Sequence, residues 1–248
     1  MLSRFRLGIL LASFALVLFV ISAPSRLLGL LVPADRLVMQ GFSGSLWQGS
    51  AARCLVATGN GYVHLGSVTW QLSPLSLLQL SPSLAFESRW GSQHISGQVT
   101  LRNSGDFEFH ELQASVSSQL LRQFAPLMID GSFSIEFPHL RIREGLPYTA
   151  RGRVLWEGAQ WLLPQGPLPL GTYAVDIEQQ AEQELRGEIV TVSGPIVATG
   201  AVGVQGRNYD VDVLVTSRFK MDTQLQHALS LFAAPVSEGY RVQLAGEF

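Results

Sequence analysis

The sequence has little cysteine, little charge and few helical patterns. Cys54 is the one cysteine among 248 residues, so an internal disulfide is excluded. A chain of this length buries a large enough core without one. Charged residues make up 15% of the chain, and the 19 acidic residues slightly outnumber the 17 basic ones. That balance gives no basic footprint for nucleic acid.

Catalytic and metal-ligating spacings are also missing. The five histidines are scattered, without a His-Glu-x-x-His pattern, and His110-Glu111 fits an alternating strand pattern better than a ligand pair. Residues Gly41–Ser45 lack the order of a nucleophile elbow and predict a loop that leads into a strand at Leu46. We therefore expect no enzyme, and no catalytic, cofactor-binding or metal-binding residues.

Three further features have structural explanations. Asp210 and Asp212 share one face of an alternating segment, which indicates the solvated side of a strand. Residues Gly200–Gly206 lack the glycine order of a dinucleotide site and predict a thin strand that allows close backbone approach. Cys54 is interpreted as a small core residue, because Arg53 is the one basic residue near it in sequence.

The most informative segment that is present is Leu7–Ser25, which has no charge and is rich in Leu, Ile, Val, Phe and Ala. About 19 helical residues cover roughly the 30 Å hydrocarbon core of a bilayer. Arg4 and Arg6 precede the run and keep that end in the cytoplasm. The sequence predicts a cytoplasmic tail at 1–6, a transmembrane helix at 7–25, and residues 26–248 beyond the membrane.

A cleaved secretory signal is the alternative interpretation of this segment. The uncharged run is longer than the usual signal core, and Ile21 stands where a small residue is preferred for cleavage. Pro24 would directly follow the cleavage site. All three points favour a retained anchor. The apolar stretch Leu27–Val32 either extends the anchor or packs on the first strand, and the sequence does not separate these two possibilities.

The rest of the chain is typical of antiparallel β-structure with one buried and one solvated face. Apolar and polar residues alternate in five segments: Ser132–Phe137, Leu140–Arg143, Tyr173–Ile177, Tyr209–Val213 and Tyr240–Leu244. Turn residues separate the runs at 59–61, 103–105, 130–131 and 206–208. Helical periodicity is confined to Ser117–Phe124 and Asp222–Phe232, and Asp222 is a plausible N-cap.

The sequence contains an internal repeat. Four short segments have similar counterparts later in the chain, in the same order: Trp70–Pro74 with Trp161–Pro164, Ile95–Thr100 with Leu185–Ile189, Gln119–Pro126 with Gln224–Pro235, and Ile129–Ile135 with Ser237–Val242. We predict two copies of one unit, about 66–137 and 157–248, each a β-meander with one short helix, in one extended antiparallel sheet. The fold class is mainly β.

The five tryptophans lie in the strand-rich parts: Trp47, Trp70, Trp90, Trp156 and Trp161. A buried tryptophan removes about 150–250 Å² from water, so the first interpretation is that they anchor the core. The functional alternative is that some line an edge or groove that takes a partner strand or an acyl chain.

The chain resembles the type II secretion system protein N family. The resemblance rests on Gly44–Gly49 soon after the apolar segment, then Val68–Leu75, Gly152–Trp156 and the closing Leu229–Phe248. It covers essentially the whole chain, although no single motif is specific. It implies a single-pass inner-membrane subunit of the Gram-negative machine that exports folded proteins through an outer-membrane secretin. The family has no assigned catalytic or cofactor residues, so none is carried over.

Two candidate functions are compatible with the sequence and with this resemblance. The first is an accessory subunit whose periplasmic β-module acts in assembly or partner binding, with other inner-membrane and secretin components as expected partners. The second follows from a looser similarity to the AsmA-like group of membrane-anchored β-groove proteins, and is a lipid-binding or lipid-transfer module.

Overall fold

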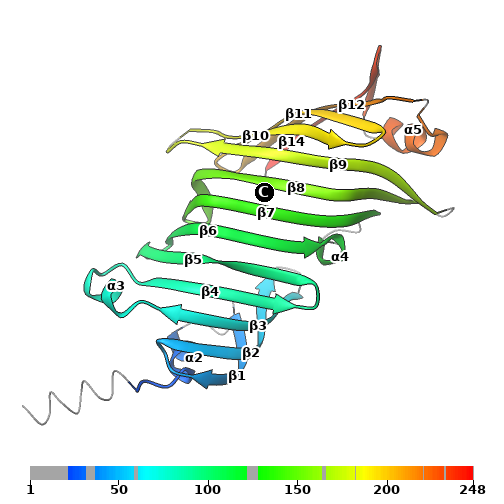
Figure 1. Cartoon of the computed structure of the whole chain (residues 1–248). Coiled ribbons are helices and arrows are strands. Elements are labelled where there is room, and N and C mark those ends of the chain that lie inside the picture. The colour runs from blue at the N-terminus through cyan, green and yellow to red at the C-terminus, as the bar shows by residue number, and fades with distance from the viewer. Residues whose placement is uncertain are drawn as a thin grey trace, which may run out of the picture. The chain divides into compact units, whose positions relative to one another are not determined.

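The computed structural model describes residues 22–31, 37–58, 61–121, 128–163, 166–181, 183–219, 221–231 and 233–247. Its contacts divide the chain into two units, Met1–Gly91 and Ser92–Phe248. Both units are mainly β, as predicted, and their strands pair antiparallel (Figure 1).

Unit 1 contains four strands in chain order within its sheet. Its elements are α2 (Arg26–Leu31), β1 (Leu37–Gly44), β2 (Gln48–Thr58), β3 (Gly61–Leu72), α3 (Pro74–Leu78) and β4 (Ser83–Trp90). Trp70 is 3% exposed, and its indole nitrogen donates to the Leu46 carbonyl at 3.1 Å. Trp70 is therefore a core residue of this unit.

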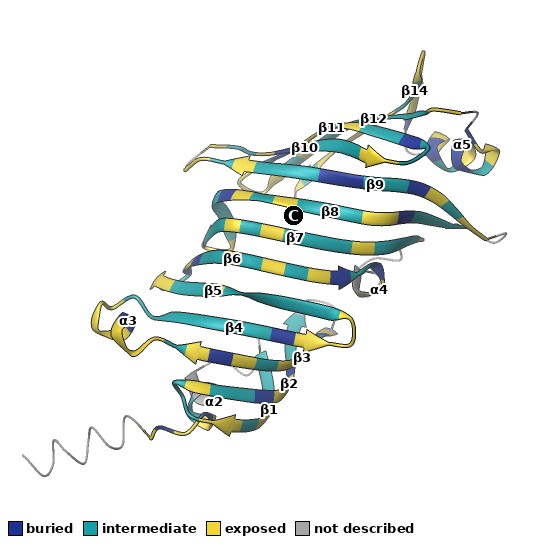
Figure 2. Ribbon diagram, viewed as in Figure 1, coloured by how far each residue is buried: buried dark blue, intermediate teal, exposed yellow. Residues whose placement is uncertain are grey.

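Unit 2 continues the same antiparallel design. Its elements are β5 (Gln93–Asn103), β6 (Asp106–Ser117), α4 (Ser118–Leu121), β7 (Ile129–Arg143), β8 (Leu146–Leu163), β9 (Gly166–Gln179), β10 (Leu185–Ser193), β11 (Ile196–Gln205), β12 (Asn208–Ser217), α5 (Thr223–Ser230), β13 (Ala234–Val236) and β14 (Gly239–Glu247). The sheet order follows the chain to β12 and ends β12-β14-β13. Figure 2 shows most strands at intermediate exposure, with buried stretches on β9 and α5.

The five predicted alternating segments and the predicted helix cap are confirmed. All five alternating segments lie on strands β7, β9, β12 and β14. The Asp222 carboxylate accepts the backbone N–H of Gln224 at 2.8 Å and of Leu225 at 3.4 Å, as an N-cap does. Leu225 and Leu229 are buried on the inner face of α5.

Most of the predicted transmembrane helix, 7–21, lies outside the described residues. Its last part, Ser22–Ser25, is not helical: Pro24 forms a β-bridge with Ser45, and the Leu46 N–H donates to the Ala23 carbonyl at 2.8 Å. Proline disfavours the helical conformation in the residue before it, which explains this difference. Among the residues that the structure describes, none of the helices combines the length and apolar character needed to cross a bilayer.

Of the two possibilities left open for the stretch after Arg26, the structure supports packing on the first strand for Leu27–Leu31, because a separate short helix, α2, begins at Arg26 and contacts β1. Three other expectations need correction. Gly41–Ser45 is largely strand β1, not a loop, and the chain bends at Leu46. The first predicted repeat has two short helices instead of one, because Pro74 starts the extra helix α3.

The turn predicted at Asp130-Gly131 is also wrong, because both residues lie inside β7. Gly131 has φ +126, and the β7–β8 register shifts between Asp130 and Ser132. The two residues therefore mark an irregularity within a strand, which glycine permits. The turns predicted at 103–105 and 206–208 are confirmed, and the centre of the one at 59–61 lies outside the described residues.

Candidate functional site

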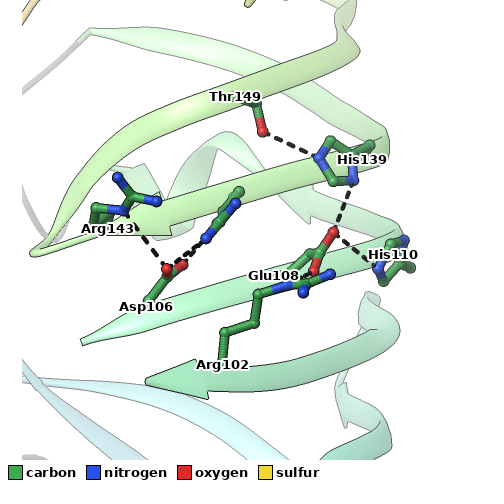
Figure 3. Close-up of polar contacts among 8 residues, drawn as sticks. Arg102, Asp106, Glu108, His110, His139, Arg143 and Thr149 are labelled. Atoms are coloured by element: carbon green, nitrogen blue, oxygen red, sulfur yellow. Dashed lines mark hydrogen bonds and ion pairs between the residues drawn. The ribbon is translucent and has the colours of Figure 1, made fainter. Parts of the chain in front are cut away.

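A cluster of charged and imidazole side chains lies on one face of β5–β8 in unit 2 (Figure 3). Glu108 and His110 are two residues apart on β6, and His139 is the cross-strand partner of His110 on β7. Alternate residues of a strand and directly paired residues of neighbouring strands point to the same face. The three side chains therefore meet.

Glu108 is the centre of this cluster. Its Oε1 is 3.5 Å from His110 Nε2 and 3.7 Å from His139 Nδ1, while Arg102 donates to the other oxygen, Oε2. The carboxylate is buried, and the hydrogen bond from Arg102 holds its pKa below the ordinary value of a glutamate. The other ring nitrogen of His139, Nε2, lies 3.0 Å from the Thr149 hydroxyl. Glu108 is thus ionised and held between two imidazoles.

A second carboxylate, Asp106, belongs to the same face. Arg141 donates to it through Nε at 2.8 Å and through a terminal nitrogen at 2.7 Å, and these bonds hold the pKa of Asp106 below its ordinary value. The Arg143 guanidinium lies 3.8 Å from the centre of the Tyr148 ring, and its Nε is 3.6 Å from Asp106. These arginines neutralise Asp106, which leaves Glu108 as the carboxylate that faces the histidines.

A pair of bulges places the polar cluster and the apolar residues on opposite faces. Two apolar rows cross strands β5 to β8 by direct pairing: Ile95, Ala114, Ile135 and Val154 form one, and Val99, Phe109, Leu140 and Ala150 form the other. The rows are four residues apart on β5 and β8 but five apart on β6 and β7. The extra residue on β6 and β7 keeps both rows on one face, and so leaves Glu108, His110 and His139 on the other.

Glycines accommodate these bulges. A Cβ on Gly152 of β8 would lie 2.4 Å from the Glu136 carbonyl oxygen, and one on Gly97 of β5 would lie 3.2 Å from the Leu112 Cα. Glu111, within the β6 bulge, has φ +50. The close backbone approach at Gly152 requires a residue without a side chain.

The apolar face of unit 2 contains a pocket of about 360 Å³ beneath α5. Its lining includes Trp156 and Trp161 of β8, Tyr173 of β9, and Leu225 and Leu229 of α5. Among the described residues that line the pocket, none has a charged side chain. Tyr173 is buried, and this burial raises its pKa to about 12. Such a pocket can hold an apolar group.

The tryptophans differ in their surroundings. Trp70 is a core residue of unit 1, and Trp156 and Trp161 pack against the core cluster of unit 2 and line the pocket. The Trp156 ring stacks on Phe133 at 5.6 Å between ring centres and packs against Tyr173 at 5.8 Å. Trp90 is 48% exposed and stacks on His64.

The other residues that the sequence singled out lie apart from the cluster. Cys54 is 2% exposed and burial raises its pKa to about 11, which confirms a core thiol. Asp212 is on a half-exposed strand face and pairs with Arg241 at 2.8 Å. A Cβ on Gly200 would lie 2.1 Å from the Asp212 carbonyl oxygen, which confirms the close backbone approach predicted for β11.

The cluster is not evident from the sequence, because Glu108 and His110 are distant from His139 along the chain. One signal was available. In β7 the apolar residues stand at odd-numbered positions over Phe133–Phe137 but at even-numbered positions at Leu140 and Ile142. This change indicates a bulge between the two segments. That bulge, with its partner on β6, would have put both histidines on the polar face.

Comparison with known families decides where the chain belongs. The sequence model of "Type II secretion system (T2SS), protein N" matches residues 35–243. The chain belongs to the type II secretion system protein N family. The resemblance seen in the sequence is therefore confirmed.

Relatives of the same name come from three bacteria. Type II secretion system protein N of Vibrio cholerae is 29% identical over 195 residues, 75% of this chain and 73% of the relative. The Klebsiella pneumoniae protein is 28% identical over 219 residues, 81% and 83% of the two chains. The Aeromonas hydrophila protein is 27% identical over 180 residues, 66% and 68%. No solved structure matches the chain.

Proposed function

We propose that this protein N family member is an inner-membrane accessory subunit of the type II secretion machinery. In this proposal residues 1–6 are cytoplasmic, an apolar segment starting at Leu7 is the single-pass anchor, and 26–248 form a periplasmic β-module. The module has no enzymatic role and acts in assembly or partner binding during export of folded proteins. The observation that carries the proposal is the family match over residues 35–243.

The sequence supports the anchor. The segment that starts at Leu7 has no charge up to Ser25, and Arg4 and Arg6 stand on its cytoplasmic side.

An open strand edge supports partner binding. β14 pairs with β12 along its length, but β13 covers only Gly239, Tyr240 and Arg241 on its other side. In the described part of the chain, Val242–Glu247 have no strand partner on that side. Unpaired backbone groups at a sheet edge can accept an added strand from another protein. We infer that β14 binds an inner-membrane or secretin component of the machinery.

Labelling from the periplasm and an export assay test the location and the role. A cysteine replaces Ser237, an exposed turn residue between β13 and β14, and Cys54 stays because it is buried. A membrane-impermeant maleimide should label Ser237→Cys in cells with a permeabilised outer membrane. Deleting the gene should make the exported proteins accumulate in the periplasm. Labelling only after lysis, or normal export without the gene, contradicts the proposal.

A lipid-binding role is a second candidate, and the apolar pocket favours it. Its volume of about 360 Å³ lies in the range of small-molecule sites. The proposed anchor keeps the module at a bilayer, so the occupant we propose is an acyl chain of a phospholipid. Trp156 and Trp161 would contact that chain.

Brominated phospholipid tests this candidate, because bromine quenches a tryptophan that it touches. The purified full chain in detergent is mixed with phospholipid brominated on its acyl chains. Quenching should fall in a Trp156→Phe, Trp161→Phe variant and persist in the matched control Trp90→Phe, whose ring lies outside the pocket. Equal quenching in all three proteins rules out the pocket as the site.

A further inference from the structure

We propose that Glu108, His110 and His139 form a binding site for a divalent transition metal, with Zn²⁺ the ion that fits best. One ligand atom from each residue lies within 4.8 Å of the other two. This site is independent of the apolar pocket and of the proposed partner edge. It would be an additional property of the β-module.

The distances suit a shared ion. In a tetrahedral zinc site with bonds of about 2.0–2.1 Å, neighbouring ligand atoms are about 3.4 Å apart. Glu108 Oε1 lies 3.5 Å from His110 Nε2 and 3.7 Å from His139 Nδ1. Both separations are too long for good hydrogen bonds but close to the edge of such a tetrahedron. The third pair, one ligand atom from each histidine, lies within 4.8 Å, so a small closing movement brings all three ligand atoms around one ion.

The neighbouring residues orient the ligands as outer-shell residues of metal sites do. Thr149 Oγ1 lies 3.0 Å from His139 Nε2 and can accept a hydrogen bond from its N–H. In that tautomer the lone pair of His139 is on Nδ1, the nitrogen that faces Glu108. Arg102 occupies Oε2 of Glu108 and leaves Oε1 to face both histidines. Figure 3 shows Arg102 and Thr149 on opposite sides of the three ligands.

The backbone makes the arrangement rigid. His110 and His139 are directly paired across β6 and β7, next to the bulges of both strands. Positions on paired strands are more precise than positions on loops. A bound ion would therefore join two adjacent strands with little rearrangement.

The donor set selects the kind of metal. Two imidazole nitrogens and one carboxylate oxygen suit zinc and other borderline ions better than calcium or magnesium, which prefer oxygen ligands. The histidine side chains are 44% and 37% exposed, so water can fill the remaining position. The charge of Arg102 opposes a cation, so we expect weaker binding than at a site made of thiolates.

Calorimetric titration of the full-length chain in detergent, without a histidine tag, tests the site with Zn²⁺ alone. We expect one saturable ion per chain. His110→Ala, His139→Ala and Glu108→Gln should each weaken binding at least about tenfold, and Thr149→Val about 10- to 100-fold. The controls His227→Ala, on α5, and Glu111→Gln, on β6 beside the site, should bind as the unmodified chain does.

X-ray absorption at the zinc edge needs no variant and so does not depend on how the variants fold. It should show two imidazole ligands and oxygen ligands on the ion bound to the unmodified chain. The proposal is overturned if the folded chain shows no saturable zinc binding, if the spectrum lacks imidazole, or if folded His110→Ala, His139→Ala protein binds zinc with unchanged affinity.

Discussion

The side chains on the two faces of the unit 2 sheet are stabilised in different ways. On the apolar face, α5 covers part of β8–β12, and Leu225 and Leu229 meet the aromatic residues of the strands. On the polar face of β5–β8, the charged residues neutralise one another, as Asp106 does with Arg141. The apolar side chains are covered by a separate element, the helix α5. The polar side chains are brought together by the pairing register of the strands that carry them.

Because the two faces are stabilised differently, mutations on them should differ in their effect on stability. Removing apolar volume beneath α5 should cost the most free energy of unfolding. Disturbing the bulges should cost less, and breaking a helix cap less again. Altering an ion pair on the polar face should have the smallest effect, because partly exposed ion pairs contribute little.

Leu229→Ala should lower the free energy of unfolding by about 2–5 kcal/mol, because it leaves a cavity between α5 and the sheet. Leu229 is 5% exposed and belongs to the core cluster of unit 2. Urea unfolding followed by tryptophan fluorescence measures the change. Leu231→Ala is the control, since Leu231 is 76% exposed and should change stability by less than about 0.5 kcal/mol. Equal effects of both substitutions would show that α5 does not cover the sheet.

Gly152→Ala should lower the free energy of unfolding by about 1–3 kcal/mol, because the new methyl group forces the β7 bulge to move. The Glu136 carbonyl oxygen would lie 2.4 Å from the added carbon. The same urea titration measures the loss. Arg151→Ala, at an exposed position on the same strand, should be nearly neutral. An unchanged midpoint for Gly152→Ala would mean that β7 does not bulge there.

Asp222→Ala should lower the free energy of unfolding by about 1 kcal/mol, because α5 loses its N-cap. The Asp222 carboxylate accepts two backbone N–H groups at the start of that helix. Asp222→Asn keeps an acceptor and should retain most of the stability. If Ala and Asn behave alike in urea, the cap does not contribute.

Stability should fall in acid partly through the polar face. The folded-state pKa values of Glu108 and Asp106 are lowered, so the unfolded state binds protons first as the pH falls. Their contribution is complete above the unfolded values of about 4 and is lost progressively as the pH falls from there through the lower folded-state values. Thermal unfolding between pH 6 and pH 3 should show a smaller loss for Glu108→Gln than for the unmodified chain. Glu111→Gln, the control, should follow the unmodified chain.

Local pattern was sufficient to predict much of this fold. Alternation placed strands at Ser132–Phe137 and Tyr209–Val213, and a single aspartate marked the start of α5. The polar cluster was not predictable in the same way, because it depends on the pairing of His110 with His139 across two strands. Register arises from tertiary packing, and a shift of one residue would put either histidine on the other face.

The two predicted repeat copies have a similar order of strands and helices, with one strand more in the second. The first copy has one strand, β6, between β5 and α4, whereas the second has two, β11 and β12, between β10 and α5. An added strand would explain why the spacing between matching segments grows toward the C-terminus. The two compact units meet at Gly91 and Ser92, inside the first predicted copy. The repeat stays a prediction.

Photocrosslinking in living cells tests most directly whether the module works by binding a secretion partner. A photoreactive amino acid at Ala245, on the open part of β14, is compared with one at Val192, which is exposed on the central strand β10. The account predicts that Ala245 crosslinks to an inner-membrane or secretin component and that Val192 does not. Identical crosslinks from both positions, or none to the secretion machinery from Ala245, would contradict it.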